Sequence, residues 1–169
     1  MDYRIRELLR EDYGLLEDFL YEAIFVPEGA VRPSRSILER PELKVYVECF
    51  GERKADMGLI AEVDGKAAGA VWVRVMNDYG HIDDMTPSFA ISLYKEYRGF
   101  GIGTALMKAM VRLLKRRGDT RGSLAVQKAN YAVNMYKKVG FRIVGENQEE
   151  YIMLSDFSDF TEDHRTKEV

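Results

Sequence analysis

Three glycines at positions 99, 101 and 103 directly precede a segment with helical periodicity, and they are the part of the sequence best suited to ligand chemistry. The segment is Arg98-Gly99-Phe100-Gly101-Ile102-Gly103-Thr104, and it follows the apolar run Phe89-Ala90-Ile91-Ser92-Leu93. This order predicts a strand, a tight turn and the start of a helix. Such a turn leaves a row of backbone N–H groups uncovered, and the helix dipole adds positive potential at the same place. We therefore expect an anion site that suits the pyrophosphate of a phosphorylated cofactor.

Two other glycine-rich nucleotide motifs fit this segment less well. A P-loop requires Gly, four residues and then Gly-Lys-Ser/Thr, a spacing that the sequence does not contain. A dinucleotide-binding turn follows the first strand of its unit and has an acidic residue about 20 positions later. Here the turn lies past the middle of the chain, and Thr120 and Arg121 stand at that distance. A turn without a ligand stays an alternative, although each glycine in an ordered element costs roughly 0.5–1 kcal/mol in conformational entropy.

The elements that must position this turn follow from hydrophobic periodicity. Apolar residues three or four positions apart predict helices, and alternation over short runs predicts strands. Asp64-Gly65 between two apolar runs is typical of a tight hairpin. In chain order we expect a strand at 3–9, a helix capped by Asp12 with apolar residues from 15 to 24, a helix at 41–50, strands at 58–63, 67–76 and 89–93, a helix at 102–117, a strand at 123–127, a helix at 130–138, and strands at 141–144 and 151–154.

This order of elements predicts one mixed α/β domain over residues 1–157, followed by a polar tail at 158–169. The net charge of −3 gives no overall positive field, so we expect no nucleic-acid partner. No apolar run approaches a membrane span, and the charged start of the chain lacks the apolar region of a signal peptide. We therefore expect a cytoplasmic protein without a membrane partner. Cys49 is the only cysteine, which excludes an internal disulfide, and no metal-binding spacing is present.

Two separate blocks carry a family resemblance. Residues 89–104 resemble the acetyl-CoA-binding segment of the GNAT superfamily of N-acetyltransferases, whose pattern after a strand is Arg/Gln-x-x-Gly-x-Gly/Ala; Arg98, Gly101 and Gly103 fill those places. Lys95 stands where a proline is common in the family. Residues 130–141 are similar to the family's Asn-x-Ala-…-Leu-Tyr-x-(Lys/Arg)-x-Gly-Phe stretch, with Met135 in the place of the leucine. The resemblance extends over about residues 3–155.

The resemblance implies a central, mostly antiparallel sheet that is splayed between its fourth and fifth strands and flanked by about four helices. Main-chain groups of the fourth strand would then pair with the pantetheine arm of acetyl-CoA like an added strand, although ordinary pairing of Leu93 with its neighbour stays an alternative. The N–H groups of the glycine turn would hold the pyrophosphate. The cofactor-binding residues that the resemblance implies are Ile91, Ser92, Leu93, Arg98, Gly99, Phe100, Gly101, Ile102, Gly103, Thr104, Asn130 and Tyr136.

Catalytic candidates also follow from the resemblance. Tyr136 matches the family tyrosine that often donates a proton to the departing CoA thiolate, a role that suits a phenol because its pKa near 10 keeps it protonated at neutral pH. A core tyrosine is the alternative, and Asn130 fits a helix cap as well as a cofactor contact. The glutamate that many relatives carry on the fifth strand is missing here. Asp83 and Asp84, and less so His81, are the candidates for the general base, with a solvated loop as their alternative.

The acceptor of the acetyl group is expected to be the amine of a small molecule or a peptide, which the sequence does not identify. The first two predicted helices, their loop and the loop before the fourth strand would line its pocket. Glu22 and Glu28 would favour a cation such as a polyamine, an aminoglycoside or lysine. Since the fifth-strand carboxylate is missing, a non-catalytic acyl-CoA-binding regulatory module is the alternative function. The sequence leaves open whether the chain forms a homodimer. The candidates for the pocket are Phe25, Glu28, Tyr46 and Trp72.

Overall fold

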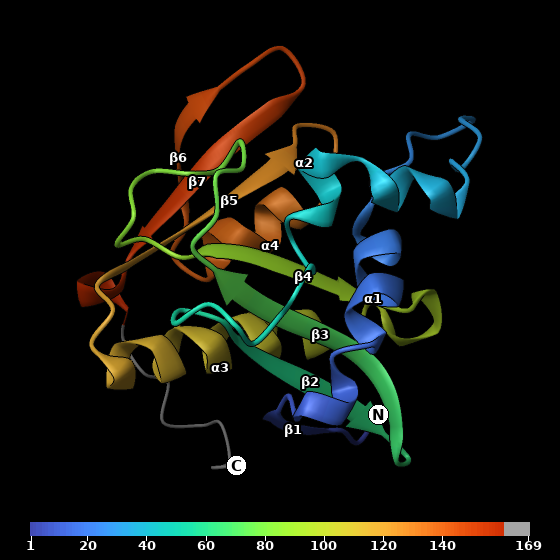
Figure 1. Ribbon diagram of the computed structural model, residues 1–169, viewed down its shortest axis with the longest axis horizontal. Helices are drawn as coiled ribbons and strands as arrows, with labels where there is room; N and C mark the ends of the chain where they lie inside the picture. Colours follow the sequence, from blue (N-terminus) through green and yellow to red (C-terminus); the bar gives the residue numbers. More distant parts are fainter. Residues whose placement is uncertain (161–169) are drawn as a thin grey trace.

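The computed structural model describes residues 1–160, which form one seven-stranded sheet with helices on both of its faces (Figure 1). The tail predicted from residue 158 lies for its greater part outside the described residues. The strands in sheet order are β1 (Arg4–Glu7), β2 (Met57–Val63), β3 (Lys66–Arg74), β4 (Ser88–Leu93), β5 (Arg121–Gln127), β7 (Glu150–Asp156) and β6 (Arg142–Glu146). The α-helices are α1 (Leu15–Ala23), α2 (Pro41–Lys44), α3 (Ile102–Arg117) and α4 (Ala132–Lys138).

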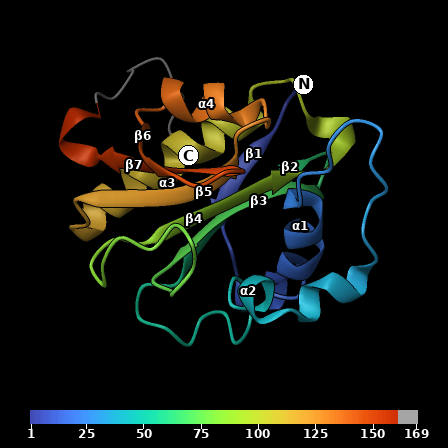
Figure 2. The same ribbon diagram turned by 90° about the horizontal axis from the view of Figure 1, so that it is seen from above.

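The sheet separates two layers of helix, as Figure 2 shows from above. Alternate residues of β3 supply the two cores, because side chains in a strand point to opposite faces in turn. Val71 and Val73 pack in the core under α3 and α4, whereas Ala70 and Trp72 pack in the core under α1. β3 is therefore apolar along most of its length, as a strand covered on both faces must be.

Helix α3 presents one apolar stripe to the sheet. Leu106, Met110 and Leu114 recur every four residues and are fully buried, so a helix of this period covers the sheet with one face. The helix ends at Gly118, whose φ of +99° suits glycine, and the next N–H, of Asp119, bonds back to the carbonyl of Leu114 at 3.0 Å. Within residues 1–160 no helix has the length and apolar character needed to cross a membrane.

The mixed α/β fold and its splayed sheet are confirmed. All strand pairs are antiparallel except β4 with β5. The hairpin between β2 and β3 turns at Asp64 and Gly65, whose φ values of +51° and +76° are the left-handed pair that a two-residue turn needs. The predicted helix at 41–50 is wrong beyond Lys44, where turns follow. Asp12 does not cap α1 either: its carboxylate binds Arg6 at 2.6 Å and the N–H of Leu9 at 2.7 Å.

A buried ion pair holds the segment that follows α2. The side chains of Arg74, at the end of β3, and Asp56 are both fully buried, and their closest atoms lie 2.9 Å apart. Arg74 also donates to the carbonyl oxygens of Val45 and Glu48 at 2.8 and 2.9 Å. One side chain of the sheet thus fixes both ends of the 45–56 segment, which carries Tyr46 toward the sheet.

Replacement of Asp56 by Asn tests this contribution. Asp56→Asn leaves the Arg74 guanidinium buried without its counter-charge, and breaking such a pair costs about 3–5 kcal/mol. Urea denaturation should show this loss in the free energy of unfolding. Asp64→Asn is the matched control, because Asp64 is exposed and Asn tolerates its left-handed backbone. A loss at Asp56 no larger than at Asp64 would contradict the structural role of the pair.

Candidate functional site

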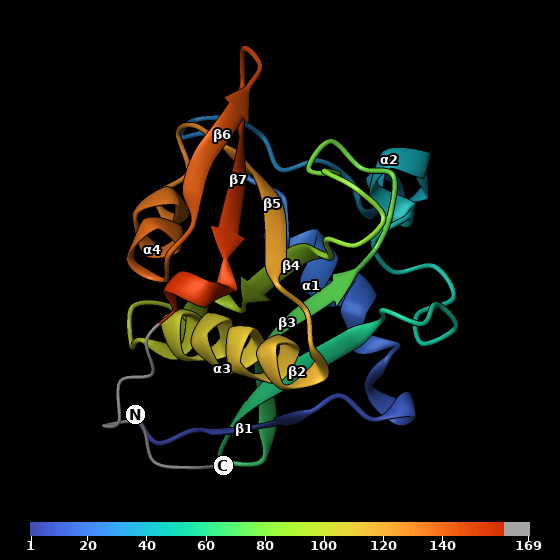
Figure 3. The ribbon, with the colours of Figure 1, turned by 90° about the vertical axis from the view of Figure 1, so that its left-hand side faces the viewer.

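β4 and β5 run in parallel but pair at one position only. Ser88 and Ser123 form that pair, and the N–H of Ser123 donates to the carbonyl of Pro87 at 3.0 Å. Beyond this point the strands diverge, as the view in Figure 3 shows. We call the two diverging edges the fork and the Ser88–Ser123 pair its base. Because the fork opens toward the carboxyl ends of both strands, the segments that follow them, the glycine turn and α4, lie at its open end.

The open edge of β4 presents backbone groups without strand partners. The N–H of Tyr94 donates to Ala68 on β3 at 3.0 Å. Main-chain groups alternate along a strand, so those of Ile91 and Leu93 point the other way, into the fork. No pair joins β4 to β5 here among the described residues, so the N–H groups of Ile91 and Leu93 remain available to an extended ligand.

The glycine turn exposes a longer row of donors. Gly99 and Gly101 have φ values of +84° and +82°, which side-chain-bearing residues rarely adopt. The first helical bond of α3 is from Ala105 to the carbonyl of Gly101, at 3.0 Å. In the described part of the chain, the N–H groups from Gly99 through Thr104 meet no acceptor, whether backbone or side chain. This row at the start of a sixteen-residue helix is a strong anion-binding arrangement.

Gly103 has a different reason to be glycine. A Cβ atom there would lie 3.2 Å from the sulfur of Met135 and 3.3 Å from Cδ1 of Leu93. The bare backbone of α3 therefore allows α4 and the end of β4 to approach closely at this point. The turn, the open edge of β4 and α4 thus meet at one place.

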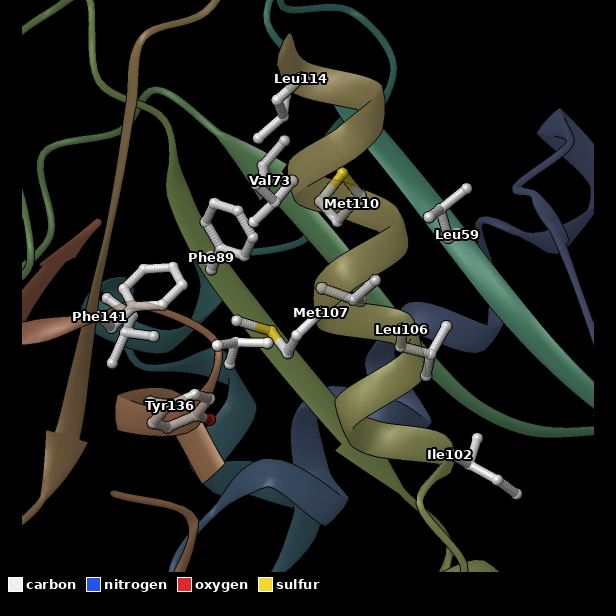
Figure 4. Close-up of a cluster of buried hydrophobic side chains, with 14 of the residues drawn as sticks. Leu59, Val73, Phe89, Ile102, Leu106, Met107, Met110, Leu114, Tyr136 and Phe141 are labelled. Atoms are coloured by element: carbon white, nitrogen blue, oxygen red, sulfur yellow. The ribbon is translucent and has the colours of Figure 1, made fainter. Parts of the chain in front are cut away.

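Tyr136 lies on α4 beside this meeting point. Its ring is buried and packs edge-on against Phe141 at 6.3 Å between centroids, so the core-tyrosine alternative is correct for the ring (Figure 4). The hydroxyl bonds to no described residue, yet within residues 1–160 no buried side-chain polar atom lacks a partner, so this oxygen keeps some contact with solvent. Burial raises the pKa of Tyr136, so the phenol stays protonated at neutral pH. It can therefore donate a proton.

Other predicted cofactor contacts have partners within the protein. Arg98 donates through Nε to the carbonyl of Leu93 at 2.9 Å and through Nη2 to Glu22 on α1 at 3.3 Å, so the guanidinium joins the end of β4 to α1. The hydroxyl of Ser92 donates to the carbonyl of Phe19 at 2.5 Å, on the α1 face. Asn130 accepts from the N–H of Ala132 at 2.9 Å, which is the capping role, and its amide NH₂ is not used in that bond.

The predicted general bases are held in other interactions. Asp83 accepts from the Thr86 hydroxyl and the Met85 N–H, both at 2.8 Å, and pairs with Arg121 at the start of β5. The Thr86 hydrogen bond, with help from the others, lowers the pKa of Asp83, which makes it a weaker base. The Asp84 side chain is 95% exposed, 3.6 Å from the ring of His81. The catalytic role of both aspartates stays a prediction that these contacts do not favour.

The structure brings together one polar cluster that the sequence analysis missed. Asp78 accepts from the hydroxyl of Tyr46 at 2.8 Å and from the hydroxyl of Ser88 at 3.1 Å. Ser88 is the base of the fork, so this carboxylate lies where β4 and β5 part. Nothing local distinguishes Asp78 from the other acidic residues of its loop, because its partners come from distant parts of the chain.

The predicted acceptor residues are dispersed. Trp72 is only 1% exposed, and its indole N–H donates to the carbonyl of Tyr46 at 3.0 Å, so Trp72 supports Tyr46 from the core. Glu22 is paired with Arg32 and Arg98, which offsets its charge. Glu28 is exposed. Of these residues, Tyr46 is the one that hydrogen-bonds to Asp78, and through Asp78 it is linked to Ser88 at the base of the fork.

Comparison with known proteins gives consistent matches. A family model described as the Acetyltransferase (GNAT) family matches residues 5–141. An N-alpha-acetyltransferase of Sulfurisphaera tokodaii is 31% identical over 107 residues, which cover 59% of this chain and 64% of that protein. A putative ribosomal protein bS18-alanine N-acetyltransferase of Bacillus subtilis is 32% identical over 94 residues, covering 55% and 58%. The chain therefore matches less than two thirds of the length of either relative.

A solved structure has the same fold. The N-acetyltransferase of Thermoplasma acidophilum, in complex with coenzyme A, superposes with a TM-score of 0.67 over 92% of this chain and 99% of that chain, at 20% identity.

A substitution in the glycine turn tests its left-handed backbone geometry. Gly101→Ala forces an alanine into a φ of +82°, which costs about 1–2 kcal/mol, so the free energy of unfolding should fall by that amount in urea denaturation. Gly14→Ala is the control: Gly14 has a helical φ of −62° and open space around it, so its replacement should be neutral or slightly stabilising. Equal effects at the two positions would contradict the geometry of the turn.

Proposed function

The chain belongs to the GNAT family of acetyltransferases, and on that premise we propose that it transfers an acetyl group from acetyl-CoA to the primary amine of an acceptor by direct attack. The observation that carries the proposal is a path formed by two groups of unpaired donors. They are the N–H groups of the glycine turn and those of Ile91 and Leu93 on the open edge of β4. An anionic head followed by an extended, amide-containing arm is the ligand that such a path suits.

Each part of the path has a role in this proposal. The turn between Gly99 and Thr104 binds the pyrophosphate of CoA, and the edge of β4 pairs with the amides of pantetheine. The thioester then lies in the fork, where a backbone N–H of β4 can hydrogen-bond its carbonyl oxygen as negative charge develops there. Arg98, bound to Leu93 and Glu22, steadies the end of β4 rather than the phosphates.

Tyr136 provides the proton for the leaving group in this proposal. As the amine nitrogen attacks the carbonyl carbon, the C–S bond breaks and the thiolate takes a proton from the phenol. The buried ring fixes the hydroxyl, and its raised pKa keeps the phenol protonated at neutral pH, so that it can hydrogen-bond to the sulfur as negative charge develops there.

Binding of the cofactor tests the proposal at its first step. Isothermal titration calorimetry of the purified chain with CoA should give a saturable signal. The affinity for CoA should weaken by about tenfold or more for Gly101→Ala and stay unchanged for Gly14→Ala. Of these two glycines, Gly101 is the one whose backbone aims the N–H groups of the turn. No heat at millimolar CoA would contradict the proposed function as a whole.

Transfer is tested by following the release of free thiol with a panel of amines. The panel contains a short peptide with an N-terminal alanine, because one relative is named an N-alpha-acetyltransferase and another a putative ribosomal protein bS18-alanine N-acetyltransferase. Spermidine and lysine complete it as cationic amines. Turnover with any member supports the enzyme. CoA binding with no turnover at all would favour the non-catalytic acyl-CoA-binding module, which the absence of a carboxylate on the fork side of β5 also supports.

Tyr136→Phe separates chemistry from binding. The variant keeps the packed ring and loses only the hydroxyl, so kcat should fall by roughly 10²-fold while the affinity for CoA stays the same. Tyr131→Phe, at the exposed residue that precedes α4, is the control and should keep the wild-type rate. An unchanged kcat for Tyr136→Phe would remove this residue from the mechanism.

A further inference from the structure

The strand that borders the fork supplies no carboxylate. Leu124 and Val126 of β5 are buried under α3 and α4, so alternation turns Ser123, Ala125 and Gln127 to the opposite face, toward α1 and α2. None of these three side chains can accept a proton from an ammonium group. If an acidic group serves the reaction on this face, it must come from another element.

The loop between β3 and β4 reaches the face of β5 that is turned toward α1 and α2. The hydroxyl of Ser123 donates to the carbonyl of Gly80 at 2.8 Å, which holds the loop on β5. A Cβ atom on Gly80 would lie 3.1 Å from the backbone nitrogen of Ala125 and 3.3 Å from Oδ2 of Asp78. The Asp78 carboxylate and the backbone of Ala125 therefore lie beside the same point. The loop can approach so closely because Gly80 has no side chain.

Two hydroxyl groups fix the Asp78 carboxylate. Tyr46 donates to Oδ2 at 2.8 Å and Ser88 donates to Oδ1 at 3.1 Å, so each oxygen is held and still has a lone pair for another donor. The two donors come from elements on different sides of Asp78, the segment after α2 and the first residue of β4. Such a carboxylate is positioned rather than merely solvated.

Within residues 1–160, no ion pair offsets the charge of the Asp78 carboxylate. Among the ion pairs of the described residues, Asp12, Asp18, Asp56, Asp83 and Asp119 each pair with an arginine, and Asp78 pairs with none. A second carboxylate, Glu150 on β7, lies opposite Gln127 at the end of β5, and its side chain accepts from Gln127 at 3.3 Å. Burial, with Glu149 and then Asp78 adding like charge, raises the pKa of Glu150. The negative potential at this end of the fork thus lacks a protein counter-ion.

We propose that Asp78 is a catalytic residue that binds the acceptor as its ammonium ion and takes one proton from it, with Tyr46 and Ser88 as positioning residues. This inference rests on the proposed acetyl transfer. The ammonium gives a proton to the carboxylate and becomes a neutral amine, whose lone pair forms the C–N bond as the C–S bond breaks. The thiolate receives its proton from Tyr136. The proton on Asp78 and the second proton of the attacking nitrogen pass to solvent, and solvent returns one proton to Tyr136.

The Asp78→Asn variant tests the proposal against the other aspartates of the loop. It keeps the shape of the side chain and removes the basic oxygen. At pH 7, with the peptide bearing an N-terminal alanine and with spermidine as acceptors, kcat/KM for the amine should fall by roughly 10²-fold. Asp64→Asn, in the distant β2–β3 turn, is the control and should keep the wild-type rate. A larger loss for Asp83→Asn or Asp84→Asn than for Asp78→Asn would overturn the assignment.

The pH profile distinguishes a base from a structural contact. A neutral amine needs no base to deprotonate it, so the deficit of Asp78→Asn should shrink as the pH rises toward the pKa of the acceptor amine. A deficit that is constant with pH would overturn the proposal. The titratable groups that face Asp78 are Tyr46 and Glu150, and both are retained in the variant. Tyr46 keeps its raised pKa and stays protonated over the range of the profile. Loss of the Asp78 charge lowers the pKa of Glu150, so Glu150 stays a carboxylate at alkaline pH and cannot cause the deficit to shrink there.

A second variant decides the case if Asp78→Asn does not fold, as judged by its thermal midpoint and its CoA titration. Tyr46→Phe keeps the ring and removes one hydrogen bond to the carboxylate. Its kcat should fall severalfold with an unchanged KM for acetyl-CoA, and an unchanged kcat would contradict the proposal. A wild-type chain that binds CoA but acetylates none of the amines contradicts the proposed function itself. An active wild type with an equally active Asp78→Asn contradicts this inference alone.

Discussion

The single pair between β4 and β5 is the constraint on which the rest of the molecule depends. A sheet normally satisfies the N–H and C=O groups of each inner strand on both sides, and here the pairing stops after Ser88 and Ser123. Aromatic side chains pack beside this pair on the α3 face: Phe89 of β4 packs edge-on against Phe141 at 5.4 Å and against Phe157 at 6.5 Å. Gly122 at the start of β5 makes room for this group, since a Cβ there would lie 2.4 Å from the ring of Phe89. The base of the fork is therefore part of the core.

The two faces of the fork receive different elements. The α3 and α4 side supplies the glycine turn and Tyr136, whereas the side of α1 and α2 supplies the loop with Asp78. Residues far from the fork set the second face. Arg74 and Asp56 anchor the 45–56 segment, and the indole of Trp72 holds the backbone of Tyr46, so that the phenol reaches Asp78. A buried ion pair thus contributes to the site through the position of one hydroxyl group, which links the stability of the segment to the geometry of the site.

Local patterns in the sequence predicted the elements that depend on local physics. The hairpin at Asp64 and Gly65, the glycine turn and the stripe of α3 all follow from backbone conformation or from helical period. The helix at 41–50 failed because Arg74 takes the carbonyl groups of Val45 and Glu48, and because Cys49 adopts a φ of +50°, which no helix contains. Asp83 was expected at the site but is bound by Arg121, and Asp78 was missed although it stands in the same loop. These partners are distant in sequence, so no local pattern could rank the aspartates.

The electrostatics of the fork also agree with two substrates that carry opposite charges when they bind. At the open end, the N–H row of the turn and the dipole of α3 attract an anion, and among the described residues no carboxylate accepts from this row. At the base, Asp78, which Ser88 holds, attracts a cation. The arginines of this part of the chain lie elsewhere: Arg121 on Asp83, and Arg98 and Arg32 on Glu22. A CoA thioester and a protonated amine would therefore be drawn to opposite ends of the fork, and the unpaired edge of β4 would lead the acyl group from one end to the other. The same break in the sheet thus supplies both the binding edge and the place where the two substrates meet.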